Sequence, residues 1–178
     1  MNPLEALEEL YAALQERFFG KYRGFVESNE DPKGRGRLQV RVPNVMKDQL
    51  IWATPCVPYA GQGVGLFALP PKDAGVWVEF EGGDTSHPIW VGCFWADNQV
   101  ASDESKPGVK TLRTDGAALK FDDDNGVVTI ETGDGTTLTI GGGEIKLEAN
   151  DVSASANGGK LALSAGGLDV NNGAFSVS

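Results

Sequence analysis

The first half of the chain alternates apolar and polar residues with a period of two, which is typical of β-strands with one buried face. The clearest block follows the turn sequence Asp31-Pro32-Lys33-Gly34, where Leu38, Val40 and Val42 are separated by polar residues. Short strands separated by Gly and Pro at this spacing predict a small β-barrel over residues 20–97. The expected strands cover residues 21–28, 37–43, 50–57, 64–69, 75–81 and 88–95.

Residues 1–19 show a helical pattern instead. Asn2 can cap the helix, Pro3 suits its first position, and Gly20 is a stop signal. The apolar residues at alternating three- and four-residue steps, as in a coiled-coil seam, are Leu4, Leu7, Tyr11, Leu14 and Phe18. The pattern is too short to establish a coiled coil, and the alternative is a helix lying on its own barrel. We therefore expect this seam to be an assembly contact.

Residues 110–178 repeat a pair of apolar residues at alternate positions, with Gly, Asn and Asp turns between the pairs. The pairs start 7 to 10 residues apart: Leu119/Phe121, Val128/Ile130, Leu138/Ile140, Ile145/Leu147, Val152/Ala154, Leu161/Leu163, Leu168/Val170 and Phe175/Val177. A short repeat of strand plus turn predicts a β-solenoid. Only two apolar residues per strand point inward, so three chains wound together would close the core. Residues 98–109 are polar, contain Pro and Gly, and are predicted to be a linker.

The ordered residues of the barrel region resemble the OB-fold domain of the baseplate assembly protein V and central-spike family of phage tails and contractile injection systems. The resemblance covers about residues 20–94. The matching residues are Gly24-Phe25-Val26, Asp31-Pro32, Gly36-Arg37-Leu38, Val40, Val42-Pro43, Trp52-Ala53, Pro58, Gly61, Gly65, Pro70-Pro71, Gly75-Val76-Trp77-Val78-Glu79-Phe80, Gly83-Asp84, His87-Pro88-Ile89 and Gly92. The repeats after the linker resemble the triple-stranded β-helix that follows the OB domain in this family.

The resemblance implies a mainly β protein: an N-terminal helix, an OB-fold barrel, and an intertwined triple-stranded β-helix. It also implies a homotrimeric spike that is attached to a baseplate hub and pierces a target cell envelope. The expected trimer core is Leu119, Phe121, Val128, Ile130, Leu138, Ile140, Ile145, Leu147, Leu161, Leu163, Leu168 and Val170. The expected hub contacts are Leu4, Leu7, Tyr11, Leu14 and Phe18.

The last strand ends with Phe175 and Val177 still pointing inward. Some spikes of the family close their tip with a histidine-x-histidine metal site, but His87 is the only histidine of this chain. We therefore expect Phe175 and Val177 to contact a separate tip protein of the proline-alanine-alanine-arginine (PAAR) type.

Charge argues against nucleic acid as a partner. The net charge is −10, with −4 on residues 1–100 and −6 on residues 101–178. The cluster Lys33, Arg35, Arg37 and Arg41 is better interpreted as a solvated face or as a docking patch for an acidic partner than as a phosphate track. The alternative function is an OB-fold module that binds a carbohydrate or single-stranded nucleic acid, carried on a β-solenoid stalk. The Trp residues are compatible with carbohydrate binding, which therefore stays an alternative.

No motif indicates catalysis, a metal or a cofactor. The Gly-rich residues 58–65 lack the ending of a P-loop, and residues 122–126 do not fit an EF-hand. Cys56 and Cys93 are expected to be buried free thiols. His87 would have to serve any Ser/His/Asp triad, but the sequence has no Gly-x-Ser-x-Gly turn for the nucleophile. Some members of the family carry a muralytic domain between the barrel and the β-helix, and the linker of residues 98–109 has no room for one. We expect a non-enzymatic protein that is made in the bacterial cytoplasm without a signal peptide and joins a virion tail or injection particle.

Overall fold

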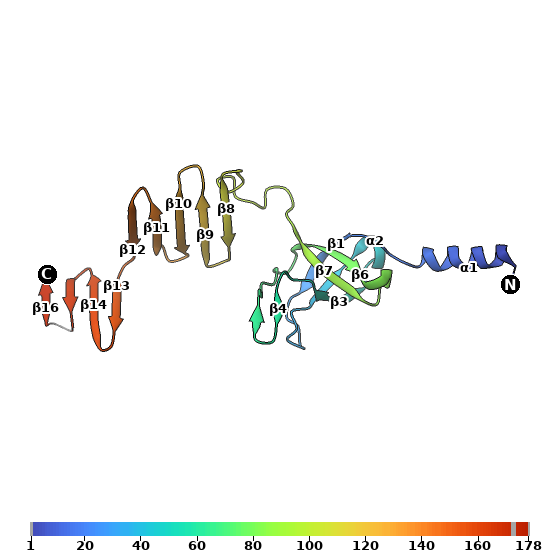
Figure 1. The fold of residues 1–178 in the computed structure, drawn as a ribbon, viewed down its shortest axis with the longest axis horizontal. Coiled ribbons are helices and arrows are strands. Elements are labelled where there is room, and N and C mark those ends of the chain that lie inside the picture. The colour runs from blue at the N-terminus through green and yellow to red at the C-terminus, as the bar shows by residue number, and fades with distance from the viewer. Residues whose placement is uncertain (1, 172–173, 178) are drawn as a thin grey trace. The chain divides into compact units, whose positions relative to one another are not determined.

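The computed structural model describes residues 2–171 and 174–177. The chain divides into two compact units, residues 1–99 and residues 100–178, and each is described by itself. Figure 1 shows the helices and strands of each unit. The first unit holds helix α1 (Pro3–Gln15) and a closed barrel, and the second holds two antiparallel sheets.

The barrel closes in the strand order β1-β2-β3-β7-β6. Its strands are β1 (Tyr22–Ser28), β2 (Leu38–Arg41), β3 (Leu50–Pro55), β6 (Gly75–Phe80) and β7 (Pro88–Phe94). All neighbours pair antiparallel except β3 and β7, which run parallel. Short elements occupy the connections: α2 (Pro43–Met46), the hairpin of β4 (Ala60–Gly61) and β5 (Val64–Gly65), and η1 (Glu81–Gly83). This closed five-stranded barrel is OB-like, as the sequence predicted.

The barrel core consists of the apolar residues whose alternation predicted the strands. Val26, Leu38, Val40, Val42, Ala53, Val76 and Val78 are completely buried, and Phe80 and Trp90 are nearly so. The indole Nε1–H of Trp90 donates to the carbonyl oxygen of Gly36 at 3.2 Å. The indole N–H, the only polar group of the Trp90 side chain, therefore has a hydrogen-bond partner inside the barrel.

Helix α1 begins as predicted but ends earlier. The Asn2 side chain accepts a hydrogen bond from the Leu4 N–H, and Glu5 completes a capping box. The helix ends at Gln15, well before Gly20. Phe18 packs on the barrel instead, with its ring centroid 6.0 Å from that of Tyr22. The prediction of Phe18 as part of the helical seam was therefore wrong.

The second unit is built from hairpins. β8 (Val109–Arg113), β9 (Ala117–Asp122), β10 (Val127–Thr132), β11 (Thr137–Gly141) and β12 (Glu144–Glu148) form one sheet. β13 (Val152–Ala156), β14 (Gly159–Ser164), β15 (Gly167–Val170) and β16 (Phe175–Val177) form the other. Each strand pairs antiparallel with the next strand of its own sheet. Every predicted apolar pair lies in a strand, and β8 is an additional strand at the end of the predicted linker.

The pairing within one chain differs from the expected winding of three chains. Two-residue turns with positive φ at both positions reverse the chain at once, for example Asn157 (φ 48°) and Gly158 (φ 85°) between β13 and β14. Such turns match the twist of a two-stranded hairpin. The structure therefore has meandering sheets, in which hydrogen-bonded neighbours come from the same chain.

The two cysteines also depart from the prediction. Cys56 and Cys93 are free, as expected, but both are exposed rather than buried. Cys56 follows the end of β3, and Cys93 lies on β7.

Candidate functional site

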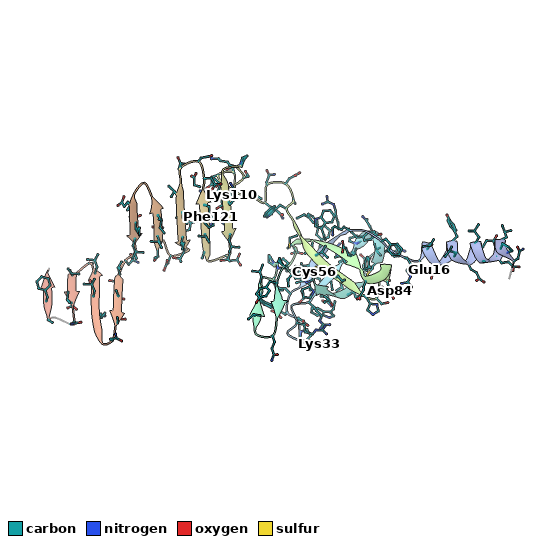
Figure 2. All side chains as sticks on the ribbon, in the orientation of Figure 1. Glu16, Lys33, Cys56, Asp84, Lys110 and Phe121 are labelled. Atoms are coloured by element: carbon teal, nitrogen blue, oxygen red, sulfur yellow. The ribbon has the colours of Figure 1, made fainter. Side chains whose placement is uncertain are left out.

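The five-stranded sheet gathers its apolar side chains into two rows that run across the strands. The first row is Leu112, Leu119, Ile130, Leu138 and Leu147, joined by direct cross-strand pairing. The second is Phe121, Val128, Ile140 and Ile145, with Lys110 paired to Phe121 at its β8 end (Figure 2). Because side chains alternate between faces, both rows lie on one face of the sheet.

The four-stranded sheet repeats this arrangement. Val152, Leu163 and Leu168 form one row, and Ala154, Leu161, Val170 and Phe175 form the other. The backbone of Val177 pairs with Leu168 and extends the first row, while its side chain lies outside the described part of the chain. The structure thus places every predicted trimer-core residue on the apolar face of one of the two sheets.

The opposite face of the five-stranded sheet is polar. Its central row is Thr111, Lys120, Thr129, Thr139 and Lys146. Arg113 lies between two carboxylates. Its Nε is 2.9 Å from Oε1 of Glu104, and its Nη2 is 2.9 Å from Oε1 of Glu131. The hydrogen bonds that the Arg113 guanidinium donates to Glu104 and Glu131 raise its pKa. This face is therefore suited to water, and Glu104 ties the predicted linker to the edge of the sheet.

The apolar rows are uncovered in the single chain. Ile145 is 73% exposed, Leu112 68%, Phe175 58%, Leu163 53% and Leu147 51%. A sheet normally buries its apolar face against another layer, and a contiguous exposed apolar patch marks an interaction surface. We call the two rows of both sheets the apolar face and take it as the candidate functional site. An exposed apolar face of this kind is suited to association with other protein surfaces.

Helix α1 presents a second uncovered apolar surface, which we call the α1 stripe. Its members are Leu4 (62% exposed), Leu7 (62%), Leu10 (57%), Tyr11 (65%) and Leu14 (53%). The stripe contains all the predicted seam residues except Phe18. It also contains Leu10, which the seam pattern missed, although its position three residues after Leu7 places it on the same side of the helix.

The β4–β5 hairpin borders a cavity of about 420 Å³ that the sequence did not indicate. Tyr59, Leu66 and Phe67 line it and remain largely exposed, while Gly36 and Trp90 form its barrel side. The lining is mostly apolar. The cavity therefore extends the exposed apolar surface of the barrel and does not resemble a phosphate cradle.

The predicted basic cluster is divided by an ion pair. Arg37 Nη2 lies 2.6 Å from Asp31 Oδ1, and Asp31 also accepts hydrogen bonds from the backbone N–H groups of Lys33 and Arg35. The Arg37 guanidinium, followed by these N–H groups, holds the pKa of Asp31 well below its ordinary value. Arg37 is thus committed to the turn before β2 through a largely buried ion pair and is not a free charge of a basic patch.

Arginines also stack on aromatic rings on the outside of the barrel. The guanidinium of Arg23 lies 4.9 Å from the Trp77 ring centroid and 4.6 Å from that of Phe94, and Arg41 lies 5.4 Å from Phe25. These contacts join β1, β2, β6 and β7 on one surface. Cations over aromatic faces stabilise the barrel, and the same chemistry is used to bind sugars or unpaired bases.

His87 is exposed at the start of β7, with Nδ1 3.5 Å from Asp84 Oδ2. The described residues contain no group of three or more His, Cys, Asp or Glu side chains that could hold a metal ion. None of the described helices is long and apolar enough to cross a bilayer. The absence of an enzymatic function stays a prediction.

Comparison with protein families gives one match. Residues 22–95 match the family described as the Type VI secretion system/phage-baseplate injector OB domain. The matched range starts with β1 and ends just after β7, so it coincides with the closed barrel. A search of curated proteins finds no match for the chain.

Proposed function

Residues 22–95 are an OB domain of the Type VI secretion system/phage-baseplate injector family, and from this premise we propose that the chain is the central spike of a contractile tail or injection system. The family supports a baseplate spike-related role. The observation that carries the finer proposal is the apolar face, which is continuous across each sheet and uncovered in the single chain. Three copies that turn this face inward would form a stiff needle.

The width of the apolar face favours three copies around one axis. Two inward residues per strand span about 7 Å, because alternate residues of a strand are about 6.8 Å apart. Three such narrow stripes fill the centre of a triangular prism, and each side of the prism shows its polar face to water. Strands β8 to β16, at about 4.8 Å per strand, give about 43 Å of rod. Since each sheet pairs within its own chain, the sides of the prism would be single-chain sheets rather than interwoven strands.

The mechanism is mechanical. A narrow rod of hydrogen-bonded sheets would transmit the force of sheath contraction to its tip and pierce the target cell envelope. Packing of the three sheets also protects the apolar face from unwanted association. The chain would be made in the bacterial cytoplasm and would act as part of a virion tail or an injection particle, with no nucleic acid as its partner.

Localisation in the particle tests the proposal. Antibody labelling of purified particles should place this chain at the baseplate centre, and particles assembled without it should contract but fail to pierce target cells. Recovery of the chain only as a free protein, with particles of unchanged activity, would contradict the spike function.

The N-terminal helix serves attachment in this proposal. Removal of residues 1–19 should leave the trimer intact and weaken its binding to the baseplate hub, because the helix precedes the barrel and the apolar face lies beyond it. The readout is the solution mass of the truncated chain together with its recovery in particles. Loss of the trimer on truncation would show that the helix, rather than the apolar face, holds the copies together.

A tip protein of the PAAR type would cover the last layer of the needle. Phe175 is 58% exposed on β16, where the apolar face ends in the described chain. The double variant Phe175→Lys and Val177→Lys should abolish co-purification with such a tip protein, because two charges per chain would meet its base. Unchanged binding of the double variant would contradict this contact.

The stacked arginines favour one alternative, an OB-fold module that binds a carbohydrate or single-stranded nucleic acid. The guanidinium of Arg23 lies over the Trp77 ring, and such modules combine basic and aromatic side chains of this kind. Titration with cell-wall oligosaccharides and with oligothymidine, followed by Trp fluorescence, separates the two functions. A spike gives no saturable change, whereas a binding module gives one that Trp77→Ala removes.

A further inference from the structure

The connection between the two sheets of the second unit differs from the hairpin turns on either side of it. β12 is the end strand of the five-stranded sheet and β13 is the end strand of the four-stranded sheet, and in the described chain the two do not pair (Figure 1). Only residues 149–151 join them, without the positive φ found in the turns at Gly142-Gly143 and Asn157-Gly158. Each sheet therefore ends at this junction in a strand with one free edge.

The free edge of β12 is formed by the backbone groups of its two apolar residues. Gly141 pairs with Glu144 across the two-residue turn from β11, and a β-turn closes such a pair with a backbone hydrogen bond. Hydrogen-bonded and non-hydrogen-bonded pairs alternate along an antiparallel ladder, so Glu144 and every second residue after it direct their N–H and C=O groups toward β11. The backbone groups of Ile145 and Leu147 therefore point to the free edge.

The free edge of β13 is formed by polar residues instead. Counted back from the pair that closes the turn to β14, Val152 and Ala154 direct their backbone groups toward β14. The backbone groups of Ser153 and Ser155 therefore point to the free edge. The side chains of these serines lie on the polar face, because strand residues alternate between faces.

Two hydrogen bonds elsewhere in the sheets agree with this assignment. The N–H of Thr132 donates to the C=O of Thr136 at 3.0 Å, which directs the even-numbered residues of β10 to β11 and the odd-numbered residues of β11 to β12. The N–H of Asn171 donates to the C=O of Lys160 at 2.8 Å, which directs the even-numbered residues of β14 to β15 and the odd-numbered residues to β13. Both free edges are thus fixed from their neighbouring strands as well.

An antiparallel pair of β12 with β13, as in the rest of the meander, would separate the two apolar faces. Directly opposed residues of an antiparallel pair have their side chains on the same face. Hydrogen bonding between the two free edges would place Leu147 opposite a serine of β13. The apolar face of one sheet would then continue as the polar face of the other. This mismatch gives a physical reason for the end of the meander at β12.

A parallel pair would keep both apolar faces on one side. In a parallel ladder, a residue that bonds to the partner strand lies beside a residue whose own backbone groups point away. Ile145 would then lie beside Val152. Leu147 would lie beside Ala154 in the same register. Parallel strands of one chain need a connection of about a dozen or more residues, which residues 149–151 cannot provide. Another copy of the chain can supply the parallel strand.

We propose that β13 of each copy pairs in parallel with β12 of the next copy, so that the chain changes sides of the needle at residues 149–151. This inference rests on the proposed spike function and specifies how its copies are joined. Threefold symmetry provides the parallel direction, because the three β12 strands run in the same sense around the axis and β13 continues in that sense over one edge of the prism. Each side of the prism then combines the five-stranded sheet of one copy with the four-stranded sheet of its neighbour.

The exposure of the apolar residues beside the junction supports this exchange. Ile145 on β12 is 73% exposed, whereas its direct partner Ile140 on the inner strand β11 is 44% exposed. The neighbour's β13 would cover the open side of Ile145 and would continue both apolar rows without interruption. Pairing would also remove the two free edges, which otherwise invite association with unrelated strands.

Engineered disulfides test the exchange in the full-length chain. Cys56→Ser and Cys93→Ser first remove the two exposed native thiols. Lys146→Cys with Ser153→Cys then places thiols on the polar face of adjacent parallel strands, about 4.8 Å apart, which is within reach of a disulfide. The matched control is Thr139→Cys with Ser153→Cys. Because Thr139 pairs with Lys146 from β11, this control moves one thiol a strand further away.

Oxidation should join the Lys146→Cys/Ser153→Cys chains into a covalent trimer of about 56 kDa on a non-reducing gel, because each 18.8 kDa copy links to the next around the axis. The control should remain a covalent monomer. Co-expression of the two single variants, Lys146→Cys and Ser153→Cys, should give covalent dimers, whereas neither single variant alone should do so. Sedimentation of the reduced proteins should show trimers throughout.

A disulfide within single chains, or no cross-link in a double variant that is still a trimer when reduced, would overturn the exchange and leave the spike function intact. If the double variant does not assemble, the co-expressed single variants decide, and trimers without covalent dimers would overturn the exchange. A wild-type chain that sediments as a monomer would contradict the spike function itself, and the exchange with it.

Discussion

Leu163→Asp tests the apolar face at the centre of the four-stranded sheet. Leu163 pairs laterally with Val152 on β13 and Leu168 on β15, and it is 53% exposed in the single chain. Inward packing of three copies would cover the remaining surface. The substitution places a carboxylate where three apolar side chains would meet.

The magnitude follows from the exposed fraction. Complete burial of a Leu side chain contributes about 1.5–3 kcal/mol, so covering the remaining 53% contributes about 1 kcal/mol per chain and about 3 kcal/mol per trimer. Leu163→Ala should therefore weaken trimer association by about a hundredfold. Leu163→Asp adds the cost of moving three carboxylates out of water, several kcal/mol in all, and should leave mainly monomers.

Acidification should partly reverse the effect of Leu163→Asp. Burial disfavours the charged carboxylate, so the pKa of the introduced Asp is higher in the trimer than its ordinary value of about 3.9 in the free chain. The protonated form assembles better, and trimer should reappear as the pH falls from neutral to about 5. Leu163→Lys should show no such recovery.

Sedimentation velocity over a range of protein concentration and pH measures these changes. Ser155→Asp is the matched control, because Ser155 is exposed on the opposite face of the same sheet. It should assemble as wild type. A Leu163→Asp trimer as stable as wild type, or equal disruption by Ser155→Asp, would refute the inward-facing apolar core.

Two further predictions concern the barrel. Gly75→Ala should destabilise it by about 1–3 kcal/mol, because a Cβ at Gly75 would lie 2.5 Å from the Phe94 ring. Gly116→Ala, in the second unit, adds a Cβ that meets no atom within 4 Å and should leave the thermal midpoint of the barrel unchanged; equal barrel midpoints for the two variants would contradict this packing. Asp31→Asn should lower barrel stability at neutral pH, because it removes the ion pair with Arg37 that depresses the Asp31 pKa. In the wild type this stabilisation is present above about pH 4 and is lost as the pH falls through the depressed pKa. Denaturant unfolding against pH checks this, and a parallel pH dependence in wild type and Asp31→Asn would exclude the ion pair as its source.

The sequence predicted the barrel well because its signal was local. Leu38 and Val76 lie in period-two blocks whose apolar residues are completely buried, and Gly and Pro separate those blocks. The end of α1 was harder to predict. Gly20 has a positive φ of 107°, typical of a helix stop, yet contacts of Phe18 with the barrel end the helical conformation earlier. Tertiary packing outweighed the local stop signal.

The apolar face was also predictable, but the pairing of its strands was not. Alternation assigns Leu138 and Ile140 to one face whether their neighbours come from the same chain or from another. The dipeptide Asn157-Gly158 indicates pairing within one chain, because both residues have the positive φ that a tight two-residue hairpin requires. Strand β8 was missed because Lys110 stands where an apolar partner of Leu112 would complete the repeated pair.

The solution mass of the full-length chain tests the central claim most directly. Three chains of 18.8 kDa predict a species of about 56 kDa by sedimentation equilibrium, stable to dilution and to mild denaturant. A monomer of 18.8 kDa that persists at high concentration would leave the apolar face uncovered and would contradict the spike.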